Sequence, residues 1–195
     1  MFVQIPDEAH ATGEVAAYFA AQREFWGFLP NYAACFSTRP DVAQAWNALN
    51  GAVRGGMDRR RFEIATIAAA RERRSTYCAV AHSKFLRDVC GDGATVQAIA
   101  DDPTGGRLEE QDRAVFTFAT KVVRDPASVQ QSDVDAVRSA GLSDAEVIDV
   151  VFAVAARLFF TTVLDGLGAQ LDRETAEEFE PGLRDGMLVG RSPAT

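Results

Sequence analysis

The chain has 195 residues, of which 47 % are hydrophobic and 25 % are charged, so it is long enough to bury a core without disulfides or metal. Its formal net charge of −8 argues against nucleic acid and anionic membrane as partners, because both would repel an acidic surface. Three cysteines, an odd number, favour a reducing compartment, and the chain does not open with a basic segment followed by an apolar one. We therefore expect a cytoplasmic protein.

Helical periodicity runs through nearly every segment, and no alternating strand pattern of useful length occurs. Pro40 near the start of one helix and Gly55 just past its end are typical helix boundaries. Ser143, followed by Glu146 three residues later, is a capping-box signature. The expected helices are 13–25, 31–37, 40–54, 58–71, 76–89, 95–100, 109–123, 132–139, 144–165 and 169–179.

The sequence predicts a single all-α domain over residues 1–195, a multi-helix bundle. Its motif helices are expected at about 58–90, and its tail, 180–195, is expected to be irregular. The most apolar segment, 147–164, contains Asp149 and Arg157 and is short for a transmembrane helix. We interpret it as a buried core helix, so no membrane partner is expected.

Cys78 and His82 stand four residues apart in the segment RRSTYCAVAHS, 73–83. At the helical period, Phe85 lies about 20° from Cys78 and His82 about 40° from it, so both reactive residues belong to the apolar stripe that faces the core. In the preceding helix, Glu63 falls at the edge of a buried face, where a carboxylate is costly unless it is paired. The histidine of the next helix is an available partner.

Ser75 follows a charged run and suits the N-cap of the helix that carries Cys78, with its hydroxyl facing the Cys78 backbone N–H. A thiol in the first turn also lies near the positive end of the helix dipole, which favours the thiolate. His82 would accept the thiol proton, and Glu63 would fix the imidazole tautomer. A nucleophile, a base and an orienting carboxylate are therefore all candidates.

The same residues also have ordinary interpretations. A buried cysteine is a common small hydrophobe, a helical histidine is often only a hydrogen-bonded core group, and Glu63 could lie at the surface. Ser75 is better explained as a cap than as a catalyst. A zinc site of Cys78, His82 and Glu63 is not expected, because no four-ligand spacing is present, and no metal or cofactor is predicted. No role is assigned to His10, Cys35 or Cys90.

Taken together, these residues resemble a known signature. Glu63, eleven further residues and then Ser75-Thr76-Tyr77-Cys78-Ala79-Val80-Ala81-His82 resemble Glu-x11-Cys-x2-Cys-x3-His, the motif of the alkylhydroperoxidase D and carboxymuconolactone decarboxylase family. All spacings match, and the one mismatch is Ser75 in place of the first cysteine. The segments 26–46 and 118–151 resemble the branch often called peroxidase-related enzymes, so the likeness covers about residues 20–172.

The resemblance implies an all-α fold and a homo-oligomer, a dimer, trimer or hexamer. It places Cys78 at the position that attacks the peroxide, His82 at the base and Glu63 at the relay carboxylate. Ser75 stands at the resolving position, where a hydroxyl cannot form the disulfide. Tyr77 occupies a slot where some members have a histidine, which leaves a second relay in doubt.

A further departure lies before the segment DGLG, 165–168. Members of the branch often carry an Asn-Arg pair there, and this chain has Thr161 and Thr162. The resemblance therefore implies that a substrate contact is changed or lost.

Without a resolving sulfur, attack on a hydroperoxide would leave Cys78 as a sulfenic acid. Cys90 is twelve residues on, about 18 Å along a continuous helix, whereas a disulfide needs Cα atoms within about 7 Å. Cys90 therefore cannot resolve Cys78 unless the helix unwinds or another subunit supplies it, and Cys35 stays open. The simplest expectation is a one-cysteine mechanism in which an external thiol reduces Cys78.

Three functions follow as hypotheses. The first is a thiol-dependent hydroperoxidase-like oxidoreductase that uses Cys78, takes a small hydroperoxide as substrate and has a depressed Cys78 pKa. The second is a lyase of the carboxymuconolactone decarboxylase kind, in which His82 and Glu63 act on a lactone or ring substrate. The third is a non-catalytic helical oligomer that binds a small apolar ligand or senses oxidation.

Overall fold

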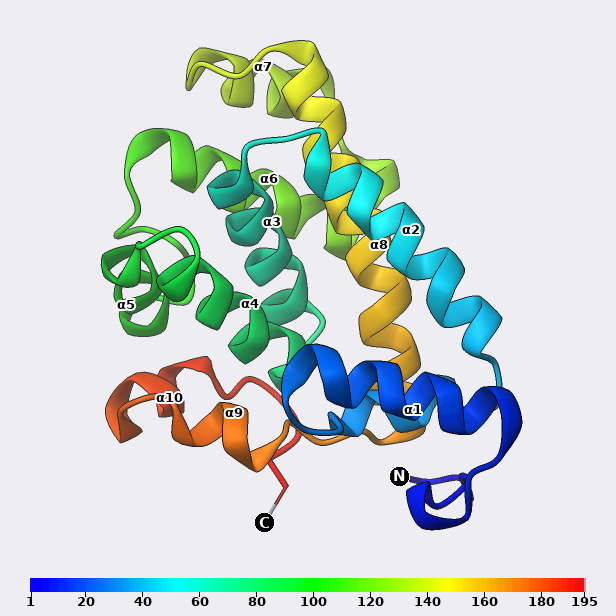
Figure 1. The fold of residues 1–195 in the computed structure, drawn as a ribbon. Coiled ribbons are helices and arrows are strands. Elements are labelled where there is room, and N and C mark those ends of the chain that lie inside the picture. The colour runs from blue at the N-terminus through cyan, green and yellow to red at the C-terminus, as the bar shows by residue number, and fades with distance from the viewer. Residues whose placement is uncertain (195) are drawn as a thin grey trace.

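The computed structural model describes residues 1–194, which form ten α-helices and three short 3-10 helices, with no strand among them (Figure 1). The all-α prediction is confirmed. The α-helices are α1 (Gly13–Trp26), α2 (Pro40–Gly55), α3 (Arg59–Glu72), α4 (Thr76–Asp88), α5 (Gly93–Asp101), α6 (Glu110–Arg124), α7 (Gln131–Ser139), α8 (Asp144–Leu167), α9 (Arg173–Glu177) and α10 (Pro181–Met187). The 3-10 helices are η1 (Glu8–His10), η2 (Asn31–Phe36) and η3 (Pro126–Ser128).

Helix α3 is the centre of the core. Every residue from Phe62 to Ala70 is buried, which is the pattern of a helix enclosed on all sides. It packs mainly against α6, α4 and α8, and Figure 1 shows it in the middle of the bundle. Its small side chains, four alanines among these nine residues, let the neighbouring helices approach closely.

Helix α8 is the long apolar helix predicted from the sequence. The capping box forms as expected: the Ser143 hydroxyl accepts a hydrogen bond from the Glu146 backbone N–H, and the Glu146 carboxylate accepts from the Ser143 N–H. Within residues 1–194 it alone is long and apolar enough to cross a membrane, but half of its most apolar window is buried inside the fold. That burial is typical of the core helix of a globular domain.

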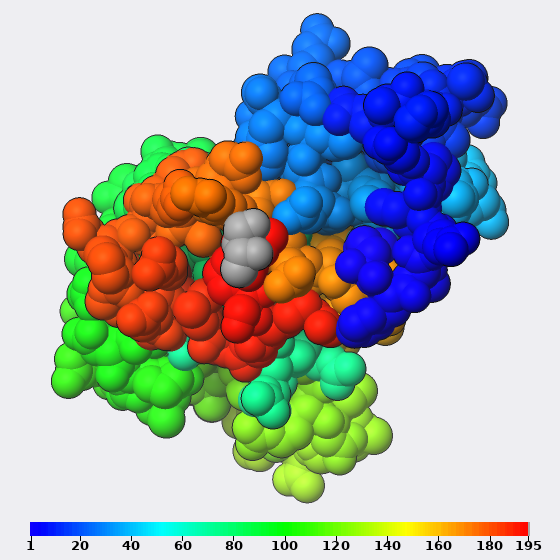
Figure 2. Space-filling model, turned by 90° about the horizontal axis from the view of Figure 1, so that it is seen from below, coloured from blue at the N-terminus to red at the C-terminus, as the bar shows by residue number. Residues whose placement is uncertain are grey.

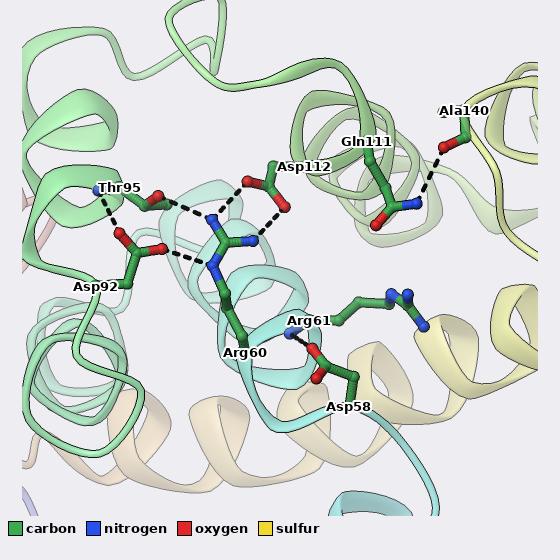
Figure 3. Close-up of polar contacts among 8 residues, drawn as sticks. All are labelled: Asp58, Arg60, Arg61, Asp92, Thr95, Gln111, Asp112 and Ala140. Carbon is green, nitrogen blue, oxygen red and sulfur yellow. Dashed lines mark hydrogen bonds and ion pairs between the residues drawn. The ribbon is translucent and has the colours of Figure 1, made fainter.

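One arginine ties three helices together (Figure 3). The Arg60 guanidinium of α3 donates two 2.6 Å hydrogen bonds to the Asp112 carboxylate of α6 and one of 2.6 Å to Asp92. Asp92 is also the N-cap of α5, where its other oxygen accepts the Thr95 backbone N–H at 3.0 Å. Bidentate charge-assisted bonds of this kind fix the relative position of the elements that carry them.

The prediction of an irregular tail over 180–195 is wrong for its first half, because residues 181–187 form α10. Pro181 stands in the first turn, where its missing N–H is harmless, and Met187 at the other end is buried. Gly186 allows the close approach to α5, since an added Cβ would lie 2.9 Å from the Ala100 Cβ. This packing joins residues distant in sequence, so no local pattern reveals it.

The residues after α10 run across the turn between α3 and α4. The Thr76 hydroxyl accepts the backbone N–H groups of Val189 at 3.2 Å and Gly190 at 2.9 Å. Both ends of the chain meet on this face: Figure 2 shows the red C-terminal segment beside orange α9 and close to the blue N-terminal residues. The Phe2 N–H donates to the Leu167 carbonyl at 2.9 Å, and the Arg191 guanidinium lies over the Phe2 ring.

Candidate active site

Four of the five predicted site residues line one cavity of about 700 Å³, and Ser75 lies outside its wall. Helix α3 contributes Glu63, helix α4 contributes Tyr77, Cys78 and His82, and α8 contributes Arg157. Eight aromatic side chains form much of the remaining wall. They are Phe25, Trp26, Phe28, Tyr32, Trp46, Phe62, Phe85 and Phe160. An apolar wall with a few polar groups is typical of a site for a small organic ligand.

The turn between α3 and α4 sets the relative position of the two motif helices. Arg74 has a φ of 57°, in the left-handed region, and the Ser75 N–H returns to the Ala70 carbonyl at 2.8 Å. These are features of a Schellman ending, which terminates α3 and starts α4 without a spacer. The two helices therefore lie side by side, and their buried faces share the cavity wall.

Glu63 and His82 form the pair that the sequence predicted. The Glu63 Oε2 lies 2.5 Å from Nδ1 of His82, and its Oε1 accepts the Arg59 Nε–H at 2.5 Å. The Glu63 side chain is fully buried, and each of its two oxygens has a partner, which offsets the cost of burying the carboxylate. Because Nδ1 is engaged, Nε2 is the ring nitrogen of His82 that remains for chemistry.

Burial determines the protonation of this pair. Burial and, to a smaller extent, the charge of Arg157 lower the pKa of His82 to about 4, and the Glu63 carboxylate only partly opposes them. Burial raises the pKa of Glu63, but the attraction of His82 and Arg59 outweighs it and leaves that pKa below its ordinary value. Near neutral pH, the site therefore contains a neutral imidazole and an ionised carboxylate.

Cys78 lies in the same wall with its side chain almost completely buried. Its thiol makes one polar contact, to Nη1 of Arg157 at 3.7 Å, and has no hydrogen bond to His82 within residues 1–194. Burial raises the pKa of the Cys78 thiol, and the nearby Arg157 and Ser75 lower it by less. The expectation of a depressed pKa is therefore wrong, because removal of the sulfur from water outweighs the helix terminus.

Ser75 is the N-cap residue of α4, but its hydroxyl does not cap the helix. It is fully buried without a hydrogen bond of good geometry. It lies near the Cys78 thiol and the Asp165 carboxyl, and it favours the ionised form of both. The predicted bond to the Cys78 N–H is therefore absent, and the hydroxyl lies instead near the side chains of Cys78 and Asp165.

Tyr77 has a structural partner. Its hydroxyl donates to Asp172 in the interior, and the other oxygen of Asp172 accepts the Asn31 backbone N–H at 2.6 Å. These bonds connect α4, the start of α9 and η2. Tyr77 borders the cavity, but its hydroxyl is engaged away from Cys78.

Arg157 is the site residue that the sequence reasoning missed. It lies in the middle of the apolar segment of α8, is 3 % exposed, and its Nη1 reaches Cys78. Its guanidinium carbon lies 5.5 Å from the Trp46 ring centre and 5.3 Å from that of Phe160, within cation–π range. A single arginine in an otherwise apolar core helix could have indicated this role, because burying an unpaired charge is costly.

The other residues singled out from the sequence lie apart from this chemistry. The Thr161 hydroxyl donates within its own helix, to the Arg157 and Leu158 carbonyls, and Thr162 is exposed. Cys35 and Cys90 are free and partly buried. Within residues 1–194, no group of three His, Cys, Asp or Glu side chains is arranged to hold a metal ion.

The comparison with known families supplies an independent observation. Residues 40–101, which include Glu63, Ser75, Cys78 and His82, match the carboxymuconolactone decarboxylase family. This segment of the chain is therefore similar to that family. The recognition made from the motif is confirmed, although the matched range is less than half of the chain. No curated protein sequence matches it.

Solved structures of the same fold cover almost the entire chain. An alkylhydroperoxidase D core protein from Ralstonia eutropha JMP134, described as peroxidase-related, is 22 % identical, with 99 % of this chain and 97 % of that chain covered and a TM-score of 0.77. A peroxidase-related protein from Silicibacter sp. TM1040 is 20 % identical, with 89 % and 93 % covered and a TM-score of 0.76. These likenesses establish the alkylhydroperoxidase D-like fold.

A third neighbour was solved with an organic ligand. A cysteine-to-alanine variant of the debrominase Bmp8 in complex with 2,3,4-tribromopyrrole is 19 % identical, with 92 % of this chain and 98 % of that chain covered and a TM-score of 0.72. At this level of identity, the likeness concerns the fold alone. The same fold therefore occurs in a protein that was solved with a bound ring compound.

Proposed function

We propose that this protein is a thiol-dependent hydroperoxidase-like oxidoreductase in which Cys78 is the nucleophile. The observation that carries the proposal is the convergence of three features on one cavity: the Cys78 thiol, the Arg157 guanidinium 3.7 Å from it, and the Glu63–His82 pair. The match of residues 40–101 to the carboxymuconolactone decarboxylase family and the fold shared with a peroxidase-related protein support it.

The first step reduces the peroxide and oxidises the protein. The Cys78 thiol gives its proton to neutral His82 through a water or the substrate, because no hydrogen bond joins the two side chains in residues 1–194. The thiolate sulfur then attacks the terminal oxygen of the hydroperoxide, so that an S–O bond forms and the O–O bond breaks. His82 returns the proton to the departing alkoxide, which leaves an alcohol and a Cys78 sulfenic acid.

The second step restores the thiol with an external reductant. One small thiol attacks the sulfenic acid and releases water, which gives a mixed disulfide on Cys78. A second thiol then attacks the mixed disulfide, which frees Cys78 and yields the oxidised reductant. Ser75 cannot take the place of the first thiol, because a hydroxyl does not form a disulfide.

The test is mass spectrometry of the three cysteines after a peroxide pulse, with and without a small thiol. We expect Cys78 to oxidise, the added thiol to restore it, and peroxide consumption to disappear in Cys78→Ala. Cys35→Ser and Cys90→Ser are the matched controls and should consume peroxide normally. The proposal is wrong if Cys78 stays unoxidised and no small thiol supports peroxide consumption.

A second candidate function is acid–base chemistry on a ring or lactone substrate, without the thiol. Two observations favour it: the Cys78 thiol has no hydrogen bond to His82, and burial keeps it protonated. Neutral His82, oriented by Glu63, would then be the base. Turnover of a lactone that survives Cys78→Ser but not His82→Gln would establish this candidate in place of the first.

We also propose that the chain forms a homo-oligomer through the outer face of α8. Ile148, Val151, Phe152 and Phe159 are exposed there at helical spacing, which is unusual for a monomer. A second copy of the chain is the occupant we expect. Phe152→Lys should reduce the particle mass measured by light scattering. If the variant has the same mass as the wild type, this interface is rejected.

A further inference from the structure

Arg157 has unused capacity to bind a ligand. Arg157 is only 3 % exposed. In residues 1–194 its Nη1 alone has a hydrogen-bond partner, the Cys78 sulfur. Its Nε is buried without any partner in residues 1–194. A guanidinium has donors along its whole planar edge, so most of its hydrogen-bonding capacity is unsatisfied.

The charge of Arg157 is also uncompensated. No carboxylate lies within ion-pair distance of it in residues 1–194, although the chain has other arginines that pair with acids at the surface. The two acids that border the cavity are held by other groups: Glu63 by His82 and Arg59, and Asp172 by Tyr77 and a backbone N–H. A buried, unpaired charge is destabilising and calls for a ligand or a counter-ion.

The neighbourhood is unusually positive for this protein. Three arginines, Arg54, Arg59 and Arg157, border the cavity, against the carboxylates of Glu63 and Asp172, in a chain whose net charge is −8. Cys78 adds no negative charge while it is a thiol, and His82 is neutral. Arg54 is exposed at the rim and Arg59 is paired with Glu63, so among the described residues Arg157 is the buried arginine of this cavity that lacks a carboxylate partner.

We propose that Arg157 binds the carboxylate of an anionic organic substrate, whose ring or chain lies against Trp46 and Phe160. Arg157 provides the planar fork that matches a carboxylate, and the two aromatic side chains hold the guanidinium in place. The carboxylate anchored there lies beside Cys78, so the reactive part of the substrate is confined to the space between Cys78 and His82. This inference names the substrate class of the proposed site, and it does not depend on which reaction occurs there.

A structural role for Arg157 makes the opposite prediction about stability. An arginine retained for packing or ion pairing should destabilise the fold when it is replaced. An arginine kept for a ligand is costly in the free protein, so Arg157→Met should leave the ligand-free melting temperature unchanged or raise it. Arg157→Lys keeps the charge but loses the planar fork, and provides a second variant if Arg157→Met fails to fold.

The experiment compares carboxylates with their uncharged amides. Benzoate, trans-cinnamate and 4-phenylbutyrate, together with benzamide, cinnamamide and 4-phenylbutyramide, are titrated into the protein by calorimetry. We expect at least one carboxylate to bind tenfold or more tightly than its amide, a difference that Arg157→Met abolishes. Arg54→Met, at the exposed rim of the same cavity, is the matched control and should keep it.

Cys78→Ala separates this inference from the proposed chemistry. We expect that variant to bind the carboxylates as well as the wild type, even though peroxide consumption is lost. If the wild type consumes no peroxide but still prefers carboxylates through Arg157, the hydroperoxidase proposal fails and the anion site stands. If every carboxylate binds no better than its amide, or if no probe binds in the millimolar range, the anion site is wrong.

Discussion

The Glu63 carboxylate lies 2.5 Å from Nδ1 of His82, which leaves Nε2 as the free ring nitrogen of a histidine in the cavity wall. The pair joins α3 and α4 through two buried side chains. The effect of this pair on the free energy of unfolding can therefore be measured as a function of pH.

The first prediction concerns stability at acidic pH. Burial holds the pKa of His82 at about 4 in the folded chain, whereas the ordinary value of 6.5 applies after unfolding. Below pH 6.5 the unfolded chain takes up a proton that the folded chain refuses, so stability falls between pH 6.5 and 4, by on the order of 3 kcal/mol. Urea unfolding at several pH values should show this fall in the wild type.

His82→Gln is the variant that assigns the effect to one residue. Glutamine donates a hydrogen bond to Glu63 but does not titrate, so the stability of the variant should change less with pH over the same range. Identical slopes for the two proteins would mean that other groups, and not His82, bind the protons.

The second prediction concerns the reactivity of Cys78. Because burial raises its pKa, iodoacetamide should alkylate Cys78 slowly at neutral pH and faster as the pH rises. Arg157 is the nearest positive charge, so Arg157→Met should raise that pKa further and slow the reaction severalfold at a fixed pH. A faster reaction in Arg157→Met would show that the arginine blocks access and does not favour the thiolate.

The third prediction restores the missing sulfur. The Ser75 hydroxyl is buried, unpartnered and close to Cys78, so Ser75→Cys should fit without disturbing a cap. After a peroxide pulse, peptide mapping should find a disulfide between the introduced sulfur and Cys78, where the wild type has a sulfenic acid. If only sulfenic acid forms, the two positions are too poorly oriented for a bridge, which needs a specific geometry.

The fourth prediction concerns the cluster in Figure 3. Arg60→Met should destabilise the fold by about 2 kcal/mol, because it leaves the nearly buried Asp112 carboxylate without its two hydrogen bonds. The estimate stays moderate because the Arg60 side chain is 37 % exposed, and water replaces part of the loss. Arg138→Met, which breaks an exposed pair with Asp144, is the control and should change stability by less than about 0.5 kcal/mol.

The fifth prediction tests the role assigned to Tyr77. Tyr77→Phe removes the hydroxyl that donates to Asp172, and it should lower the free energy of unfolding by about 1 to 2 kcal/mol. The rate of peroxide consumption at saturating substrate should stay close to that of the wild type. A large loss of rate with unchanged stability would make Tyr77 a participant in the chemistry.

The sequence allowed the pairing of Glu63 with His82 to be predicted, because both residues fall on apolar helical faces where a polar group needs a partner. The helices were predictable for the same local reasons, such as the capping box of Ser143 and Glu146. The raised pKa of Cys78 was not, since it depends on how completely other helices close over the sulfur. Arg157 and α10 were missed because their partners lie far away in the sequence.

The Thr76 hydroxyl, in the first turn of α4, accepts the backbone N–H groups of Val189 and Gly190. An added Cβ at Gly190 would lie 1.8 Å from the Arg74 carbonyl oxygen, so the segment fits only as a bare backbone. These residues lie 113 and 114 positions after Thr76, so the helices between them can fold before this segment returns to α4. Helix α4 therefore receives these two hydrogen bonds only after residues 189 and 190 have been synthesised, and any side chain at position 190 would prevent them by pushing the segment away from Arg74.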